Sequence, residues 1–156
     1  MAACIDAGRF EEAVRSAERG TALDPNYFLA EHMLAEAYWG AGRREEALAA
    51  YERTRRLAQW NAFSAGPYAA ALWHSGERAR AESMIADFSA SPIQLWGLAT
   101  YYLQTGNIDM AADLFERMVE QRDPFAVIFA WAKITKPLRE HPRWAKIAAA
   151  MRLETT

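Results

Sequence analysis

The sequence predicts an all-α protein built from repeated helices, from its composition and from the spacing of its glycines. The 156-residue chain is 52% hydrophobic, with 8 glycines and 6 prolines, and it lacks the Val/Ile/Thr runs that are typical of strands. The phrase AGRFEEAV, from Ala7, returns as AGRREEAL from Ala41. Glycines then recur at a nearly constant spacing, which indicates stacked structural repeats.

Four glycines divide the chain into helix pairs: Gly8, Gly42, Gly76 and Gly106. Their spacings are 34, 34 and 30 residues. Glycine suits the end of a helix because it adopts the left-handed conformation at little cost. A second helix begins after each glycine, and each carries alanine at the same place: Ala13, Ala47, Ala81 and Ala111. We expect these alanines where two helix backbones approach closely.

These elements follow one another in a regular order. The first is the second helix of a partial repeat, and three repeats of about two helices each come next; the assigned ranges are 9-23, then 26-59, 61-90 and 92-123. In the repeat over 61-90 the second helix is shorter by four residues, about one turn. The stretch SASPI separates it from the next repeat. We therefore expect a local irregularity there.

The repeats resemble the tetratricopeptide repeat (TPR), a 34-residue helix–turn–helix with the pattern W-x2-L-G-x2-Y…A-x3-F…P. The matching residues of the first helices are Leu34, Ala35 and Tyr38, then Tyr68, Ala69 and Leu72, then Leu98, Ala99 and Tyr102. The tryptophan of the family is replaced by Glu31, Ala65 and Leu95. The resemblance implies an all-α, TPR-like right-handed helical solenoid of antiparallel helix pairs, whose first helices line a concave groove. It also implies a non-catalytic module for protein–protein interaction.

The end of the chain, residues 124-156, is predicted to form capping helices. The stretch RDPFAVIFAWAKI is apolar and helical in pattern, and a last amphipathic helix is expected from about Arg143 to Arg152. Residues 137-153 resemble the closing segment of TPR arrays in bacterial multidomain regulators. Because the chain also begins partway through a repeat, we expect a fragment of a larger protein. This favours an alternative function, a regulatory or sensory tail that acts by ligand sensing or self-association.

A partner-binding groove is predicted on the side of the first helices that faces away from the Leu-Ala-Tyr stripe. Its residues are Leu29, His32, Glu36, Trp39, Phe63, Ala70, Trp73, His74, Ile93, Trp96, Thr100 and Leu103. Trp39, Trp73 and Leu103 fall at equivalent positions and should form a row. Aromatic rings in a groove are common anchors for peptides. The alternative, that the two tryptophans wedge between repeats as core, stays open, and we favour partly exposed groove residues.

Charge and composition exclude several classes of function. A net charge of -2 without a basic patch argues against nucleic-acid binding by this domain. No apolar run approaches the roughly 20 residues of a membrane helix, and the start has no signal-peptide pattern. We therefore expect a cytoplasmic protein that does not bind membranes. The lone cysteine, Cys4, permits no internal disulfide.

No chemical site emerges from the motifs either. His32, His74 and His141 lack partners at metal-ligand spacing, and there is neither a phosphate loop nor a nucleophile motif. We expect no catalytic residue, no metal and no cofactor. The leading hypothesis is a protein-interaction adaptor that holds a peptide or protein segment in the groove through Trp39, Trp73 and Trp96. Self-association into a homo-oligomer is left open.

Overall fold

The structure is a computed structural model that describes residue 4 and residues 7–89 and 95–153. This part of the chain contains helices and turns but no β-strand. The helices of the repeats are α2 (Phe10–Leu23), α3 (Phe28–Gly40), α4 (Arg44–Leu57), α5 (Ala62–His74), α6 (Arg78–Ser89), α7 (Leu95–Thr105) and α8 (Ile108–Glu120). They are followed by α9 (Pro124–Ile128), the 3-10 helix η2 (Lys133–Thr135), α10 (Lys136–Arg139) and α11 (Trp144–Ala150).

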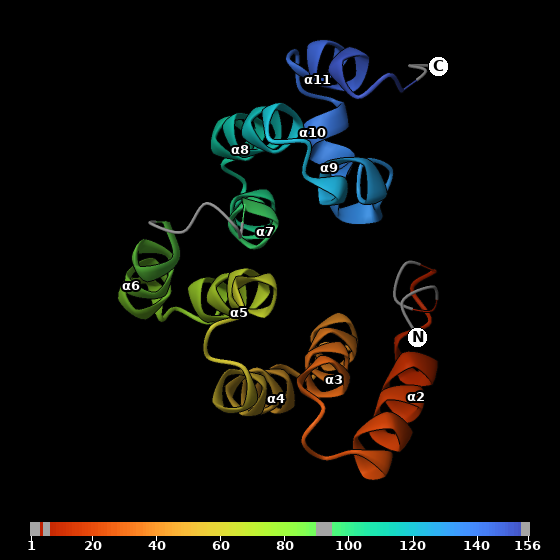
Figure 1. The fold of residues 1–156 in the computed structure, drawn as a ribbon. Coiled ribbons are helices and arrows are strands. Elements are labelled where there is room, and N and C mark those ends of the chain that lie inside the picture. The colour runs from red at the N-terminus through yellow and green to blue at the C-terminus, as the bar shows by residue number, and fades with distance from the viewer. Residues whose placement is uncertain (1–3, 5–6, 90–94, 154–156) are drawn as a thin grey trace.

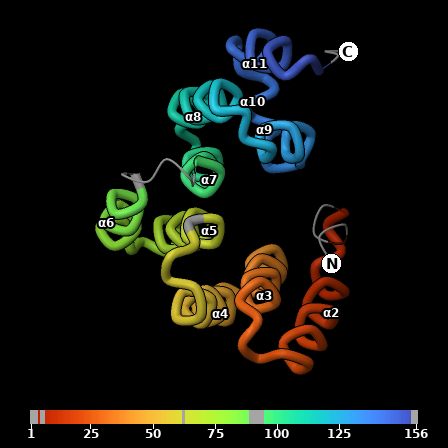
Figure 2. The backbone as a smooth tube through the Cα atoms, viewed as in Figure 1, coloured from red at the N-terminus to blue at the C-terminus, as the bar shows by residue number. Residues whose placement is uncertain are grey.

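The helices follow an arc, which Figure 1 shows as ribbons and Figure 2 as a trace. Neighbours in sequence pack as pairs, α3 with α4, α5 with α6 and α7 with α8. Helices α3, α5, α7 and α9 lie on the inner side of the arc, while α4, α6 and α8 lie on its outer side (Figure 1). The predicted all-α helical solenoid is confirmed. We call the surface of α3, α5, α7 and α9 that faces the open side of the arc the inner face.

Glycine shapes the turn inside each pair. Gly42 has a φ of 78° and Gly76 a φ of 92°, which is the left-handed region that favours glycine. After α3 the Gly42 N–H donates to the Trp39 carbonyl at 3.1 Å, and the Arg43 N–H donates to the Tyr38 carbonyl at 2.9 Å. These bonds satisfy carbonyls that the end of a helix leaves free. The same pair of bonds recurs after α5, so the turn belongs to the repeat.

Alanine allows the two helices of a pair to approach each other, as predicted. The repeated alanines Ala13, Ala47, Ala81 and Ala111 are all fully buried. Larger side chains four residues later, such as Tyr51 and Phe115, are buried as well and fill the space between pairs. The core therefore runs as a continuous strip between the inner and outer helices, which leaves the inner face free for other roles.

The segment after α8 is less regular than the sequence predicts. The apolar pattern predicts a longer helix, but α9 ends at Ile128. The Thr135 hydroxyl, which has one hydrogen to donate, lies among the carbonyl oxygens of Phe129, Ala130 and Ala132 at 2.8–3.0 Å. The Arg139 guanidinium also donates to the Ala130 carbonyl, at 3.1 Å. These side chains occupy the carbonyls that a continued helix would use, so the chain turns instead.

The last described helix, α11, packs on α8. It begins at Trp144 and is shorter than the helix predicted from about 143 to 152. The Arg143 guanidinium pairs with Asp113 at 2.6 Å and with Glu116 at 2.7 Å, and Ile147 is buried below it. No helix in the described part of the chain is both long and apolar enough to cross a bilayer.

Candidate functional site

The inner face is built from helices that carry almost no charge. Helices α5, α7 and α9 contain no Asp, Glu, Lys or Arg. Helix α3 contains two carboxylates, and both have partners. Glu31 pairs with Arg53 at 2.9 Å, and Glu36 accepts a hydrogen bond from the Tyr51 hydroxyl. A surface of this kind favours an apolar ligand, because a charged one would lose hydration without gaining a counter-charge.

The predicted groove residues fall into three groups. Partly or fully exposed side chains are Leu29, Glu36, Trp39, Phe63, Trp73 and His74. Buried side chains are His32, Ala70, Trp96, Thr100 and Leu103. Ile93 lies outside the described residues. The buried group requires a correction of the prediction, because these side chains pack between helices and offer a partner almost no surface.

A backbone contact between α5 and α7 explains much of this burial. A Cβ added at Gly66 would lie 1.7 Å from the carbonyl oxygen of Gly97. Only glycine at this position allows the two helices to come so close. The Thr100 hydroxyl lies in the same contact and donates to the Gly97 carbonyl at 2.7 Å. Ala70, further along α5, is fully buried, so α5 and α7 leave no furrow between them at these positions.

Trp39 and Trp73 occupy equivalent places, and an arginine covers each ring. The Arg44 guanidinium lies 3.7 Å from the ring centroid of Trp39, and that of Arg78 lies 4.7 Å from the ring centroid of Trp73. The His74 ring lies 6.2 Å from Trp39 and 5.0 Å from Trp73. Both tryptophans are half-buried against the core. Trp39 meets the next repeat at His74, and both tryptophans keep exposed area. They therefore combine features of the two interpretations that the sequence leaves open.

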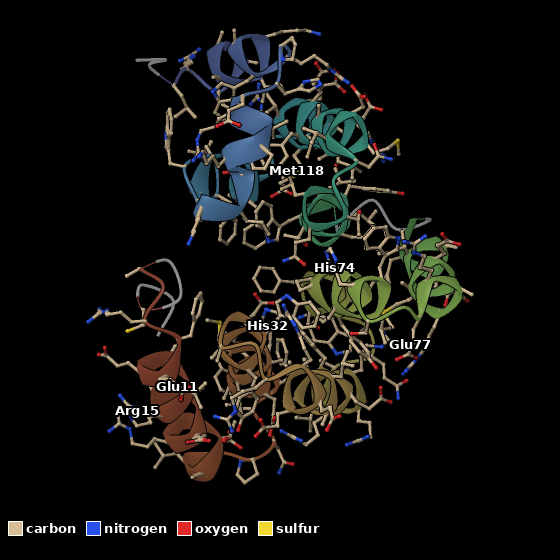
Figure 3. The ribbon with its side chains drawn as sticks, turned by 180° about the vertical axis from the view of Figure 1, so that it is seen from behind. Glu11, Arg15, His32, His74, Glu77 and Met118 are labelled. Carbon is tan, nitrogen blue, oxygen red and sulfur yellow. The ribbon has the colours of Figure 1, made fainter. Side chains whose placement is uncertain are left out.

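His74 also ties two inner helices together. Its Nε2 lies 2.9 Å from the carbonyl oxygen of Gln104 on α7. Figure 3 shows the labelled His74 on α5, close to α7. The imidazole therefore spans the same pair of helices that Gly66 brings together, at the opposite end of α5.

An aromatic cluster that was not predicted joins α5 and α7 to the segment after α8. The ring centroid of Phe63 lies 6.0 Å from that of Phe125, and Trp96 stacks on Phe129 with centroids 4.2 Å apart. Phe125 and Ile128 are 39% and 63% exposed. The signal is present in the sequence as an apolar spacing of three and four residues, typical of one helix face. If these residues only capped the last repeat, Phe125 and Ile128 would not need to be exposed.

Two polar side chains of α3 lie below this cluster, the buried His32 and the partly exposed Glu36. His32 is 4% exposed, and its Nδ1 has no hydrogen-bond partner in the structure. Its ring lies 5.4 Å from that of Phe63 and 6.2 Å from that of Tyr51. Figure 3 shows it on α3 toward α5. Burial lowers the pKa of His32 from 6.5 to about 4, whereas burial raises the pKa of Glu36 against the opposing effect of its bond with Tyr51.

Acid should destabilise the fold through His32. The unfolded chain binds a proton at this ring below pH 6.5, but the folded chain does so only near pH 4. Stability therefore falls through this window, by up to about 1.4 kcal/mol per pH unit. Glu36 acts in the opposite direction, because a raised pKa lets the folded state take up its proton first. Urea unfolding at pH 7 and pH 5 should show a smaller loss for His32→Leu than for the wild type, and equal losses would contradict this assignment.

Within the part of the chain that the structure describes, no group of three or more His, Cys, Asp or Glu residues is placed to hold a metal ion. The polar groups of the inner face, Glu36 with Tyr51 and His74 with Gln104, are engaged with each other.

Two family models with the description "tetratricopeptide repeat" match the chain, one over residues 5–65 and the other over residues 93–117. Together they cover more than half of the sequence. The interval between them contains most of α5 and all of α6, where the spacing of the repeat shortens. No curated protein matches the chain.

Proposed function

We propose a protein-binding function from one premise: the chain belongs to the tetratricopeptide repeat family. Repeats of this family generally mediate protein–protein interaction. Our proposal is that the inner face binds an apolar peptide or protein segment without catalysing a reaction. The observation that carries it is the combination of uncharged inner helices with solvent-exposed Phe125 and Ile128.

The chemistry of the inner face supports an apolar partner over a charged one. An acidic tail would find no lysine or arginine on α5, α7 or α9. An apolar segment would cover Phe63 and Phe125, whose rings already contact each other, and remove their exposed area from water. Trp39 and Trp73 lie further along the arc, and each ring is covered by an arginine of the following helix, Arg44 or Arg78. Aromatic anchors of this kind contribute most of the affinity at many interfaces.

Peptide selection tests the proposal and does not require that the partner be identified first. Peptides are selected from a random displayed library on the full chain, and their dissociation constants are measured by fluorescence anisotropy. We expect sequences rich in apolar residues. The double variant Phe125→Ser with Ile128→Ser should bind them about tenfold more weakly or worse, because it removes exposed anchors. Both side chains are exposed, so the variant should keep its helical circular dichroism.

Leu23→Ser is the matched control. This side chain is 88% exposed at the end of α2, so the substitution removes apolar surface from elsewhere on the molecule. It should leave the dissociation constants unchanged. Selection of mainly charged peptides, or equal weakening by the control and the double variant, would overturn the assignment of the inner face.

A further inference from the structure

A cleft of about 520 Å³ lies between α6 and α7, away from the cluster of Phe63 and Phe125. It forms because α6 makes little contact with α7, whereas α5 packs directly on α7. Figure 1 shows α6 on the outer side of the arc, next to the inner helices α5 and α7. Tyr101, Tyr102 and Glu82 are among the residues that line the cleft.

One earlier repeat carries a tyrosine at the equivalent position, with two charged side chains around it. Tyr38 occupies in α3 the place that Tyr102 occupies in α7. The Tyr38 hydroxyl donates to Glu18 at 3.1 Å, and the Arg43 guanidinium lies 4.4 Å from its ring centroid. The ring thus has a carboxylate at its edge and a cation on its face, which is a favourable arrangement for both.

Both of these charged partners are replaced around Tyr102. Glu18 lies five residues after the buried Ala13, and the residue five after its counterpart Ala81 is Ala86. Arg43 lies five residues after Tyr38, and the residue five after Tyr102 is Asn107. Ala86 and Asn107 both line the cleft. Two smaller uncharged side chains stand in place of two charged ones, which accounts for the open space.

A carboxylate nevertheless reaches the cleft from a different position. Glu82 lies one turn before Ala86 on α6 and forms no ion pair with any residue that the structure describes. Burial raises the pKa of Tyr101, and the negative charge of Glu82 raises it further, so the carboxylate and the tyrosines share one environment. Of the two arginines on α6, Arg78 covers Trp73, which also lines the cleft, and Arg80 pairs with Glu52 and Glu77.

Elsewhere in the molecule, a tyrosine ring and a carboxylate share one arginine. Arg80 lies 5.5 Å from the ring centroid of Tyr68 and donates to Glu52 at 2.8 Å. One guanidinium thus satisfies a ring and a carboxylate together. The rings of Tyr101 and Tyr102, 5.1 Å apart at 70°, and the carboxylate of Glu82 form the same set without the arginine.

We propose that this cleft binds an arginine side chain of a partner protein, with the guanidinium over Tyr102 and its N–H groups toward the Glu82 carboxylate. A planar guanidinium suits the site because it stacks on aromatic rings and donates to carboxylates at the same time. The cleft shares none of the residues varied to test the inner face. Failure of one assignment therefore does not decide the other.

Titration with a charged probe and its neutral isostere tests the proposal. Butylguanidinium and butylurea are added in turn to the full chain, and the indole N–H signal of Trp73, which lines the cleft, is followed by nuclear magnetic resonance. The signal is assigned with Trp73→Phe. We expect a saturable shift with butylguanidinium and none with butylurea. Equal shifts with the two probes would show apolar binding only and overturn the proposal.

Charge variants and a peptide complete the test. Glu82→Gln should weaken binding about fivefold, the effect of losing one exposed ionic partner. Asp87→Asn, on the same helix but not lining the cleft, should leave it unchanged, and equal effects of the two variants would contradict a specific site. The peptide acetyl-Gly-Arg-Gly-amide should shift the same signal. Binding of free butylguanidinium with exclusion of the peptide would overturn the assignment to a partner's side chain.

Discussion

Replacing Gly66 by alanine is expected to destabilise the protein by about 3 kcal/mol, because the new methyl group has no room. It would lie 1.7 Å from the carbonyl oxygen of Gly97, and that atom belongs to the backbone of α7. No rotation of a side chain relieves such an overlap, so α5 and α7 must separate. Since a domain of this size has only about 5–15 kcal/mol of stability, the urea midpoint should fall markedly.

Gly20→Ala is the control for this prediction. Gly20 also lies inside a helix, α2, but a Cβ there would meet the Ala30 side chain at an ordinary 3.7 Å. The same substitution should therefore stabilise the protein by about 0.5–1 kcal/mol, because alanine is the better helix former. If the change in stability has opposite signs in the two variants, the loss in Gly66→Ala comes from the contact between α5 and α7. If both variants unfold at the same urea concentration, the two backbones are not in contact in solution.

The regular part of the fold was predictable because the same glycines and alanines recur at the same places in each repeat. Gly42 and Gly76 occupy identical turns, and Ala47 and Ala81 occupy identical helix contacts. Each copy of the pattern supports the others, which compensates for the weakness of any single one. The paired inner and outer helices, and the burial of these alanines, followed from that register.

The surface of the repeats was harder to predict, because register alone does not determine how far neighbouring pairs stand apart. The contact of Gly66 with Gly97 closes α5 on α7 and buries Thr100, although the family pattern places that threonine toward the groove. Phe125 and Phe129 follow the last full repeat, where there is no further copy to align. Their contacts with Phe63 depend on how α9 is placed against α5, which the pattern of the repeat does not determine.

Trp96→Ala should destabilise the protein by about 3–5 kcal/mol, the usual effect of deleting a buried tryptophan. The side chain is 5% exposed. Its ring stacks on Phe129 with an interplanar angle of 10° and meets Phe115 edge-on at 6.0 Å. The substitution therefore removes a contact that holds the segment after α9 onto α7 and α8. Urea unfolding measures the loss, and limited proteolysis should show earlier cleavage between α9 and α11.

Trp131→Ala separates the structural role of Trp96 from a general effect of removing an indole. Trp131 is 53% exposed, meets Trp144 edge-on and lies under the Arg139 guanidinium at 5.6 Å. Because half of the ring is in water, its loss should cost less than about 1 kcal/mol. The two roles considered for Trp96 make opposite predictions. Truncating a core residue lowers the stability of the protein. Truncating a groove residue lowers the affinity for a partner and leaves the urea midpoint unchanged. If the Trp96→Ala protein is stable but no longer binds the selected peptides, Trp96 is a groove residue and not a core residue. Phe129, on which it stacks, would then lie outside the core as well.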